Sequence, residues 1–185
     1  VAQQFGDNFG GFGQPIFFEN HENLNANSNN IEKVINDIKG IVELQSGFST
    51  YAGVGIKANL DEDTKTLTAD VKVEFFTDAE DGNYFVGLYL LEDVQNIQAS
   101  RTGLQTHKNV LRNTLLPNVF NNPMHSGSIT AGTVFNFSGK LENITAKADK
   151  YKIAAVIWTK PDGKYRFFNA NIVPVTGIKS ATNDI

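Results

Sequence analysis

The sequence predicts a mainly β protein, namely an antiparallel β-sandwich of the immunoglobulin-like or jelly-roll type with one amphipathic helix near its N-terminus. Three observations support this fold class. Several segments alternate apolar and polar residues with the period of two that a half-buried strand requires. Tight polar turns separate these segments at short spacing, and only one segment has clear helical periodicity.

The composition is that of a folded domain and narrows the function classes. The 185 residues are 41% hydrophobic, with 14 Phe, so a proper core needs no cross-links. Cysteine is absent, which excludes disulfides and thiolate metal sites. The net charge is −4 and no basic stripe is present, which disfavours nucleic acid as a partner. No apolar run reaches the roughly 20 residues of a membrane-spanning helix.

Residues 1–47 are predicted to form an N-terminal segment of loop, strand and helix. The glycine-rich stretch QQFGDNFGGFGQP (3–15) predicts a loop, and IFFEN (16–20) predicts a short buried strand. From Asn30, apolar residues recur every three or four positions, which predicts an amphipathic helix ending near Gly47. Its apolar face comprises Ile31, Val34, Ile35, Ile38, Ile41 and Val42. Because the chain opens on Val1 rather than Met, we expect a processed or trimmed N-terminus.

Residues 48–176 are predicted to form the sandwich, followed by a flexible tail at 177–185. Two hairpins are expected, and the second turns at PDG (161–163), where Pro fixes φ and Gly permits positive φ. A run that is apolar on both faces, YFVGLYLLEDV, is expected to be a central strand. The predicted strands cover residues 54–60, 67–75, 84–94, 133–141, 150–160 and 164–175.

Clustered carboxylates in two turns are weak candidates for calcium ligands. Asp61 and Asp63 share one turn and Asp81 lies in another, and carboxylate oxygens on loops are what calcium prefers. Neither turn has the spacing of a known calcium loop. We therefore interpret both as solvated turns and expect no cofactor, with calcium as the alternative.

Aromatic residues and amides near the C-terminus are candidates for a carbohydrate site. Exposed rings beside amides can pack against sugars, and the candidates are Trp158, Tyr165, Phe168, Asn169 and Asn171. The alternative is that these rings belong to the core. Residues 153–158 are apolar on both faces of their strand, which favours the core interpretation.

The stretch HKNVLRNTL (107–115) could be an active site, or a polar clasp that holds the two layers of the sandwich together. A hydrolase would use Glu92, Asp93 and His107, yet no Gly-x-Ser-x-Gly turn accompanies them. We favour a clasp, in which Arg112 pairs with Glu92, or less favourably with Asp93, while His107 bonds to nearby backbone. If the pair is buried, Arg112→Ala should lower the unfolding free energy by about 3 kcal/mol.

These residues also carry a family resemblance, over positions 50–175. The sequence resembles the twenty-eight-kilodalton outer-membrane protein family of Bacteroidetes in the order of several spaced features. These are a strand ending in Glu92–Asp93, a glutamine at 98 (or 95), His107, the Val110–Leu111–Arg112 step and finally Asn169–Ala170. In that family a thioredoxin-like domain precedes the sandwich. The resemblance implies that residues 1–46 are the end of such a domain and that Pro15 is its cis-proline. Without cysteine, these residues cannot exchange disulfides.

The function expected from the resemblance is that of a non-enzymatic surface protein. It would act in adhesion, as a scaffold or as a protein-interaction module. We expect it at the outer membrane, on the cell surface or in secreted material. Its partners would be other surface or outer-membrane proteins, or a glycan.

Overall fold

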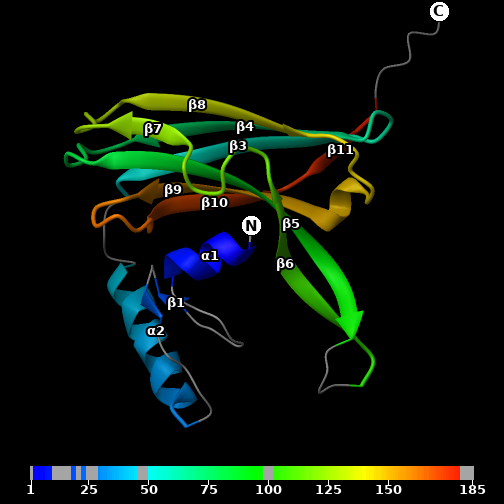
Figure 1. Cartoon of the computed structure of the whole chain (residues 1–185), viewed down its shortest axis with the longest axis horizontal. Coiled ribbons are helices and arrows are strands. Elements are labelled where there is room, and N and C mark those ends of the chain that lie inside the picture. Colours follow the sequence, from blue (N-terminus) through cyan, green and yellow to red (C-terminus); the bar gives the residue numbers. More distant parts are fainter. Residues whose placement is uncertain are drawn as a thin grey trace, which may run out of the picture.

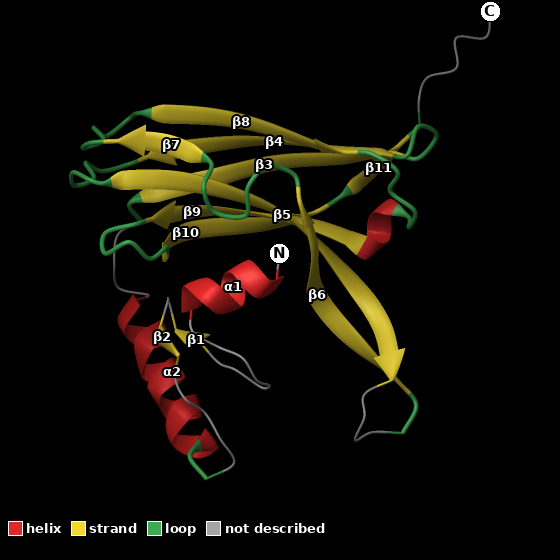
Figure 2. Cartoon of the chain, viewed as in Figure 1, coloured by secondary structure: helices red, strands yellow, loops and turns green. Residues whose placement is uncertain are grey.

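The computed structural model describes residues 2–9, 18–19, 22–23, 29–45, 50–97 and 102–179. In these ranges two β-sheets pack face to face, and helices lie on the outer side of one of them (Figures 1 and 2). The predicted mainly β sandwich is confirmed. Every pair of neighbouring strands in the two sheets is antiparallel except one.

The β5 sheet and the β4 sheet are named after their central strands. The β5 sheet has the order β10-β9-β5-β6, with β7 also paired to β5, and the β4 sheet has the order β11-β3-β4-β8. The strands of the β5 sheet are β5 (Asn83–Ile97), β6 (Leu104–Thr114), β7 (Pro123–Ser126), β9 (Tyr151–Thr159) and β10 (Arg166–Pro174). Those of the β4 sheet are β3 (Ala52–Asp61), β4 (Thr66–Phe75), β8 (Val134–Leu141) and β11 (Thr176–Ile178).

The two predicted hairpins are present with the expected turn chemistry. β3 pairs with β4 over its whole length, and the Asp61 carboxylate closes their turn by accepting from the N–H groups of Asp63 (2.9 Å) and Thr64 (3.0 Å). In the β9–β10 turn Gly163 has a φ of +75°, as the PDG sequence predicts. The predicted central strand is β5, which pairs with β6, β7 and β9.

The main core lies between the two sheets. The alternation of residues along β3, β4, β5 and β9 places one row of apolar side chains from each strand in this layer. Burial of such rows is the dominant favourable term in folding. The largest fully buried side chains are Phe75, Leu60, Leu67, Leu88, Ile153, Ile157, Val73 and Val86.

The N-terminal part contains two helices rather than the one predicted. Helix α2 (Ile31–Gln45) begins where the periodicity predicts, while Gly47 lies outside the described residues. Only Val34 of its described apolar positions is buried. Strands β1 (Phe18–Glu19) and β2 (Glu22–Asn23) form a short pair, and a 3₁₀ turn, η1 (Ala148–Lys150), precedes β9. In the described ranges no helix is both long and apolar enough to span a membrane.

Helix α1 (Ala2–Phe9) lies where a glycine-rich loop was predicted, and that prediction is wrong for residues 3–9. Phe5 and Phe9 are one helical turn apart and pack together onto aromatic rings of the β5 sheet. The Gln3 amide also donates to the Asp7 carboxylate within the helix (2.9 Å). Tertiary contact of this kind outweighs the poor helix propensity of Gly6, because short helices depend on packing more than on propensity.

Three of the described strands of the sandwich were not predicted, and neither was the short strand β2. β6 was not predicted because its polar sequence, LQTHKNVLRNT, does not alternate apolar and polar residues. β7 and β11 were not predicted because they are short. β11 is the parallel exception, pairing Gly177 with Leu60 and Ile178 with Asp61 of β3. Residues 177 and 178 were expected in the flexible tail, so this boundary is corrected: the sheet continues to Ile178.

Candidate functional site

The predicted clasp joins two neighbouring strands of one sheet. Arg112 Nε lies 2.9 Å from Glu92 Oε2, so the preferred partner is the one that the structure contains. The Arg112 side chain is nevertheless 54% exposed. Both residues belong to paired strands of the β5 sheet, so the pair does not hold the two layers of the sandwich together, and that part of the prediction is wrong.

Because the Arg112 side chain is 54% exposed, while that of Glu92 is 17% exposed, we expect Arg112→Ala to cost about 1 kcal/mol rather than the roughly 3 kcal/mol that burial of both groups would imply. Urea unfolding of the parent and the variant measures the difference. Lys140→Ala, which removes the exposed Lys140–Glu142 pair (2.7 Å), is the matched control. A loss near 3 kcal/mol for Arg112→Ala alone would mean that the guanidinium is desolvated.

Asp93 has different partners from those expected for the clasp. Its Oδ1 accepts from the Asn109 N–H (2.8 Å), and Lys152 Nζ lies 3.3 Å from both carboxylate oxygens and 2.7 Å from Asn109 Oδ1. Asn109 has a φ of +56° and lies in a β-bulge, where two residues of β6 oppose Asp93 alone. The Asp93 carboxylate therefore links the bulge of β6 to its own strand, β5, and to Lys152 of β9.

The Asn109 N–H hydrogen bond, with the nearby Lys152 and Lys108 charges, lowers the pKa of Asp93 below its ordinary value of 3.8. A lowered pKa stabilises the fold above pH 3.8, and this contribution disappears as the pH falls through the folded-state pKa. We therefore expect Asp93→Asn to be less stable than the parent at neutral pH, with the difference shrinking below pH 3.8. Urea unfolding across the acid range tests this, and a difference that is constant with pH would contradict it.

Beyond the clasp, β5 and β6 leave the sandwich as a two-stranded ribbon (Figure 1). Pairing of β5 with β9 stops at Glu92, whereas pairing with β6 continues to the Ile97–Leu104 pair. We call residues 94–97 and 104–107 the arm. At its end Ile97 is 69% and Leu104 64% exposed. The strand pairing of β5 with β6 shifts register a second time, at Arg112. This shift and the bulge at Asn109 both lie in the part of β6 from which the arm leaves the sheet.

His107 lies in the arm, opposite Val94, and is half-buried. It makes no side-chain hydrogen bond within the described part of the chain, so the predicted bond to neighbouring backbone is not present. Gln98, which the family resemblance used, lies outside the described residues, as does the candidate cis-proline Pro15.

Trp158 is buried, so it offers no platform for a sugar. It is 5% exposed, on the outer face of the β5 sheet, and the Phe5 and Phe120 rings contact it. Its Nε1 donates to the Tyr89 hydroxyl (2.9 Å), which donates to the Val119 carbonyl (2.6 Å). The core interpretation is therefore correct for Trp158, although this second core lies outside the sandwich and beneath α1.

The close packing of this outer cluster depends on a glycine. A Cβ on Gly87 would lie 2.1 Å from the Tyr89 hydroxyl oxygen, which is too close for any side chain. Burial raises the pKa of the Tyr89 phenol, so the hydroxyl keeps its proton and can donate to Val119. A fixed, neutral Tyr89 thus positions the Trp158 indole.

Tyr165 also belongs to the outer cluster. Its ring stacks on Phe120 with centroids 4.9 Å apart, and Lys160 Nζ lies 4.6 Å from its centroid. Its backbone forms two hydrogen bonds with the Asn8 side chain of α1 (2.9 and 3.0 Å). The Asn8 hydrogen bonds hold α1 against the sheet. The Tyr165 ring, a candidate for the sugar site, already contacts Phe120 and Lys160.

Asn169 and Asn171 join the two sheets. The Asn169 amide donates to the Ala52 carbonyl, and the Asn171 amide donates to the Val54 carbonyl (2.7 Å). Strand β11 pairs with β3 only at residues 59–61. The two amides therefore supply hydrogen-bond donors to the start of β3, which β11 does not reach. Their NH₂ groups are therefore engaged with backbone, which contradicts a role in ligand binding.

The three calcium candidates do not converge. Asp61 and Asp63 lie in the β3–β4 turn, whereas Asp81 lies between β4 and β5, at the opposite end of β4. Among the described residues no three His, Asp or Glu side chains are grouped to hold a metal ion. Two of the Asp61 contacts are the turn hydrogen bonds described above.

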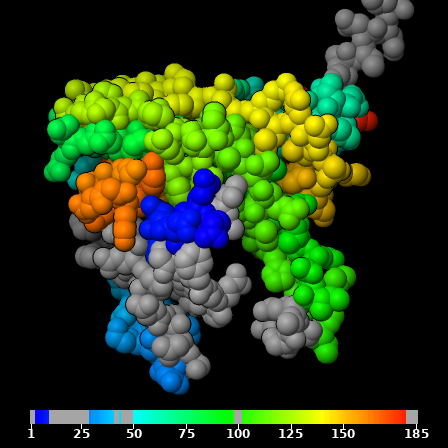
Figure 3. Space-filling view, viewed as in Figure 1, coloured from blue at the N-terminus to red at the C-terminus, as the bar shows by residue number. Residues whose placement is uncertain are grey.

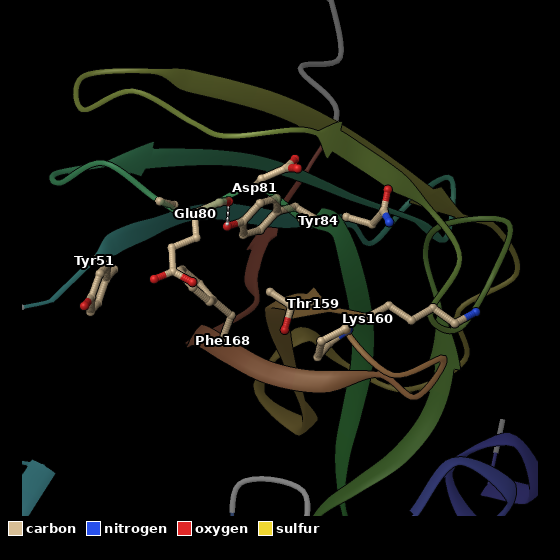
Figure 4. Close-up of a pocket in the computed structure, with 11 residues that line it drawn as sticks. Tyr51, Glu80, Asp81, Tyr84, Thr159, Lys160 and Phe168 are labelled. Atoms are coloured by element: carbon tan, nitrogen blue, oxygen red, sulfur yellow. Dashed lines mark hydrogen bonds between the residues drawn. The ribbon is translucent and has the colours of Figure 1, made fainter.

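A pocket of about 620 Å³ lies at the end of the sandwich where β5 begins (Figure 4). It is lined from three places in the chain: Tyr51 just before β3, Glu80–Tyr84 around the β4–β5 turn, and Thr159–Pro161 after β9. Phe168 of β10 completes it, which makes Phe168 the one sugar-site candidate that faces a described pocket.

Sequence reasoning missed both the pocket and the arm. The available signals for the pocket were Tyr51, an aromatic residue three positions before a predicted strand, and Glu80, in a turn interpreted as solvated. For the arm the signal was the pair of apolar residues, Ile97 and Leu104, that bracket the short polar stretch 98–103. Convergence of distant turns is not visible in a single sequence.

The fold and these surfaces define a class: a two-sheet β-sandwich with an N-terminal helix on its outer face and a projecting arm. Neither a protein-family model nor a curated protein matches the sequence. Among solved structures, "HBP35 of Porphyromonas gingivalis" aligns with a TM-score of 0.75 and 15% identity. The alignment covers all of this chain and 60% of that one, so the chain spans less than two thirds of HBP35. This likeness shows a shared fold.

Two further structures are similar at lower scores. A domain of the outer membrane lipoprotein Omp28 from Porphyromonas gingivalis aligns with a TM-score of 0.46 and 15% identity, over 72% of this chain and 93% of that one. Spo0M, a sporulation control protein from Bacillus subtilis, aligns with a TM-score of 0.38 and 10% identity, over 68% and 49%. The outer-membrane protein family that the sequence resembles is thus represented among the similar structures.

Proposed function

We propose that this chain is a non-enzymatic, surface-associated β-sandwich that binds partner proteins of the outer membrane or cell surface through its arm. The observation that carries the proposal is the exposed Ile97–Leu104 pair at the end of a two-stranded ribbon. An isolated two-stranded ribbon is marginally stable in water. A partner that covers the apolar end and one strand edge would stabilise it.

The edges of the arm lack the features that usually block strand addition. Residues 94–97 and 104–107 contain no Asp, Glu, Lys, Arg or Pro, the residues that commonly protect an edge. Within the described residues, β5 past Glu92 pairs only with β6. The arm therefore suits recognition by strand addition, in which backbone hydrogen bonds supply affinity and side chains supply specificity. Figure 3 shows the arm as green atoms leading away from the main body.

The non-enzymatic part of the proposal is supported by how the candidate catalytic groups are engaged. Glu92 is paired with Arg112, and Asp93 with Lys152 and Asn109. Neither carboxylate faces His107 through a hydrogen bond in the described structure. A general acid–base pair requires such reach to each other or to a substrate.

The surface location is supported by the family resemblance at residues 92–112 and 169–170. Adhesion and scaffolding are narrower versions of the same proposal. A glycan partner is less favoured, because Trp158 is buried and the Asn169 and Asn171 amides bind backbone.

The test is capture from an outer-membrane fraction with the parent chain and with an Ile97→Ser/Leu104→Ser variant as baits. Partners identified with the parent are then purified and mixed with each bait. We expect a defined complex with the parent and at least a tenfold weaker complex with the variant, because two exposed apolar side chains are lost. A Phe76→Ser variant, which changes an exposed apolar residue directly after β4, is the control. Equal binding by the parent and the arm variant would contradict the proposal.

A further inference from the structure

The pocket beside Tyr51 has an aromatic wall built from both sheets. Tyr51 is 57% exposed, and its ring lies 6.1 Å from that of Phe168 at 63°. The Phe168 ring in turn meets Tyr84 at 5.7 Å and 88°. Phe168 and Tyr84 are thus held by edge-on ring contacts, and Tyr51 presents a ring to solvent at the mouth.

The pocket also carries the charge of Glu80, which is exposed to solvent and has no paired cation among the described residues. In Figure 4 the Glu80 side chain points towards the rings of Tyr51 and Phe168. Its carboxylate makes no hydrogen bond or ion pair within the described part of the chain; only its backbone carbonyl is engaged, by the Tyr84 hydroxyl (2.7 Å). Burial, together with the charges of Glu80 and Asp81, raises the pKa of Tyr84, so this phenol stays neutral.

Lys160, the one basic residue of the pocket lining, is directed elsewhere. Its ammonium lies 4.6 Å from the centroid of the Tyr165 ring, which belongs to the outer cluster under α1. Figure 4 shows its side chain extending away from Glu80. The carboxylate therefore has an aromatic wall beside it and no cation of its own.

We propose that this pocket binds an arginine side chain of a partner protein, whose guanidinium would stack on Tyr51 and pair with Glu80. The planar guanidinium suits both contacts, since it stacks on aromatic faces and pairs with a carboxylate through two parallel hydrogen bonds. A neutral sugar would make no ion pair with Glu80. A lysine would supply the charge but not the planar stacking surface.

This inference does not depend on the arm. The pocket lies at Asn83 and Tyr84, where β5 begins, and the arm lies at the other end of the same strand. Failure of the arm variant to lose a partner would leave the pocket proposal standing. Failure of the pocket variants would likewise leave the arm proposal standing.

The experiment is an NMR titration of the whole chain with N-acetyl-arginine amide and, separately, with N-acetyl-citrulline amide, which has the same shape without the charge. We expect arginine to shift the amides of residues 79–84 and 159–161, with citrulline binding about tenfold more weakly because the ion pair and the cation–π contact are both lost. Binding of arginine should weaken as salt is added.

Glu80→Gln and Tyr51→Leu should each weaken arginine binding, and Asp70→Asn, which removes an exposed charge on β4, should leave it unchanged. The backbone spectrum of each variant reports whether it is folded. Equal binding of arginine and citrulline, or full binding by Glu80→Gln, would overturn the proposal. So would tighter binding of glucose or N-acetylglucosamine at the same amides, which would assign the pocket to a saccharide instead.

Discussion

Trp158→Ala should lower the unfolding free energy by about 3–5 kcal/mol, the range for truncating a large buried aromatic side chain. The indole is the shared contact of Phe5, Phe9 and Phe120, and its N–H donates to Tyr89. Its removal leaves a cavity between α1 and the β5 sheet. We therefore expect α1 to undock as well, which hydrogen exchange of the α1 amides would detect as lost protection.

Trp158→Phe separates the two parts of this effect. A phenyl ring retains most of the packing but cannot donate to the Tyr89 hydroxyl, so we expect a smaller loss of about 1–2 kcal/mol with α1 still protected. Guanidinium unfolding followed by circular dichroism measures both variants. Retention of parental stability in Trp158→Ala would show that the outer cluster contributes nothing to the fold.

The second large effect is expected at the seam between the sheets. Asn169→Leu/Asn171→Leu removes the donors to the Ala52 and Val54 carbonyls while keeping the branched shape of each side chain. Ala52 is fully buried and Val54 nearly so, which means that both carbonyls lose their partners away from water. At about 1–3 kcal/mol for each unsatisfied group, the double variant should lose about 2–5 kcal/mol.

Asn136→Leu is the matched control, because Asn136 is an exposed strand residue of β8 for which the same substitution breaks no hydrogen bond in the described structure. Chemical unfolding of both variants gives the comparison. If the double variant and the control lose the same small amount, the two amides do not join the sheets energetically.

The sequence was sufficient to predict the regular parts of the fold. The alternation in β3 and β4 and the turn chemistry at Gly163 are local signals, and both hairpins formed as predicted. The central strand β5 was also predicted from a local signal. A strand that is covered on both faces has apolar residues on both faces, and the sequence of β5 shows this.

The elements that depend on distant contacts could not be predicted. Helix α1 forms because Phe5 and Phe9 meet an aromatic cluster contributed by residues 89, 120 and 158, which no local pattern reveals. Strand β6 is polar and irregular because it carries two bulges, so it lacks a period of two.

The candidate site was predicted in part. The Arg112–Glu92 pair was anticipated from the tendency of a guanidinium beside apolar residues to find a carboxylate, but its exposure was not. The exposure of Arg112 depends on where β5 and β6 leave the rest of the sheet, and this follows from the strand pairing, which a single sequence does not show. The amides of Asn169 and Asn171 were expected to face a ligand because they lie beside aromatic residues. The β3 carbonyls that they bind lie 117 residues earlier in the chain, so no local pattern shows this contact.

The chain contains a single tryptophan, and it lies directly beneath α1. Intrinsic tryptophan emission of the chain therefore originates from one position, at the boundary between the N-terminal helix and the sandwich. A red shift of this emission at denaturant concentrations that leave the sheets intact would register the lifting of α1 by itself. The molecule thus contains its own optical probe for that one movement, without any added label.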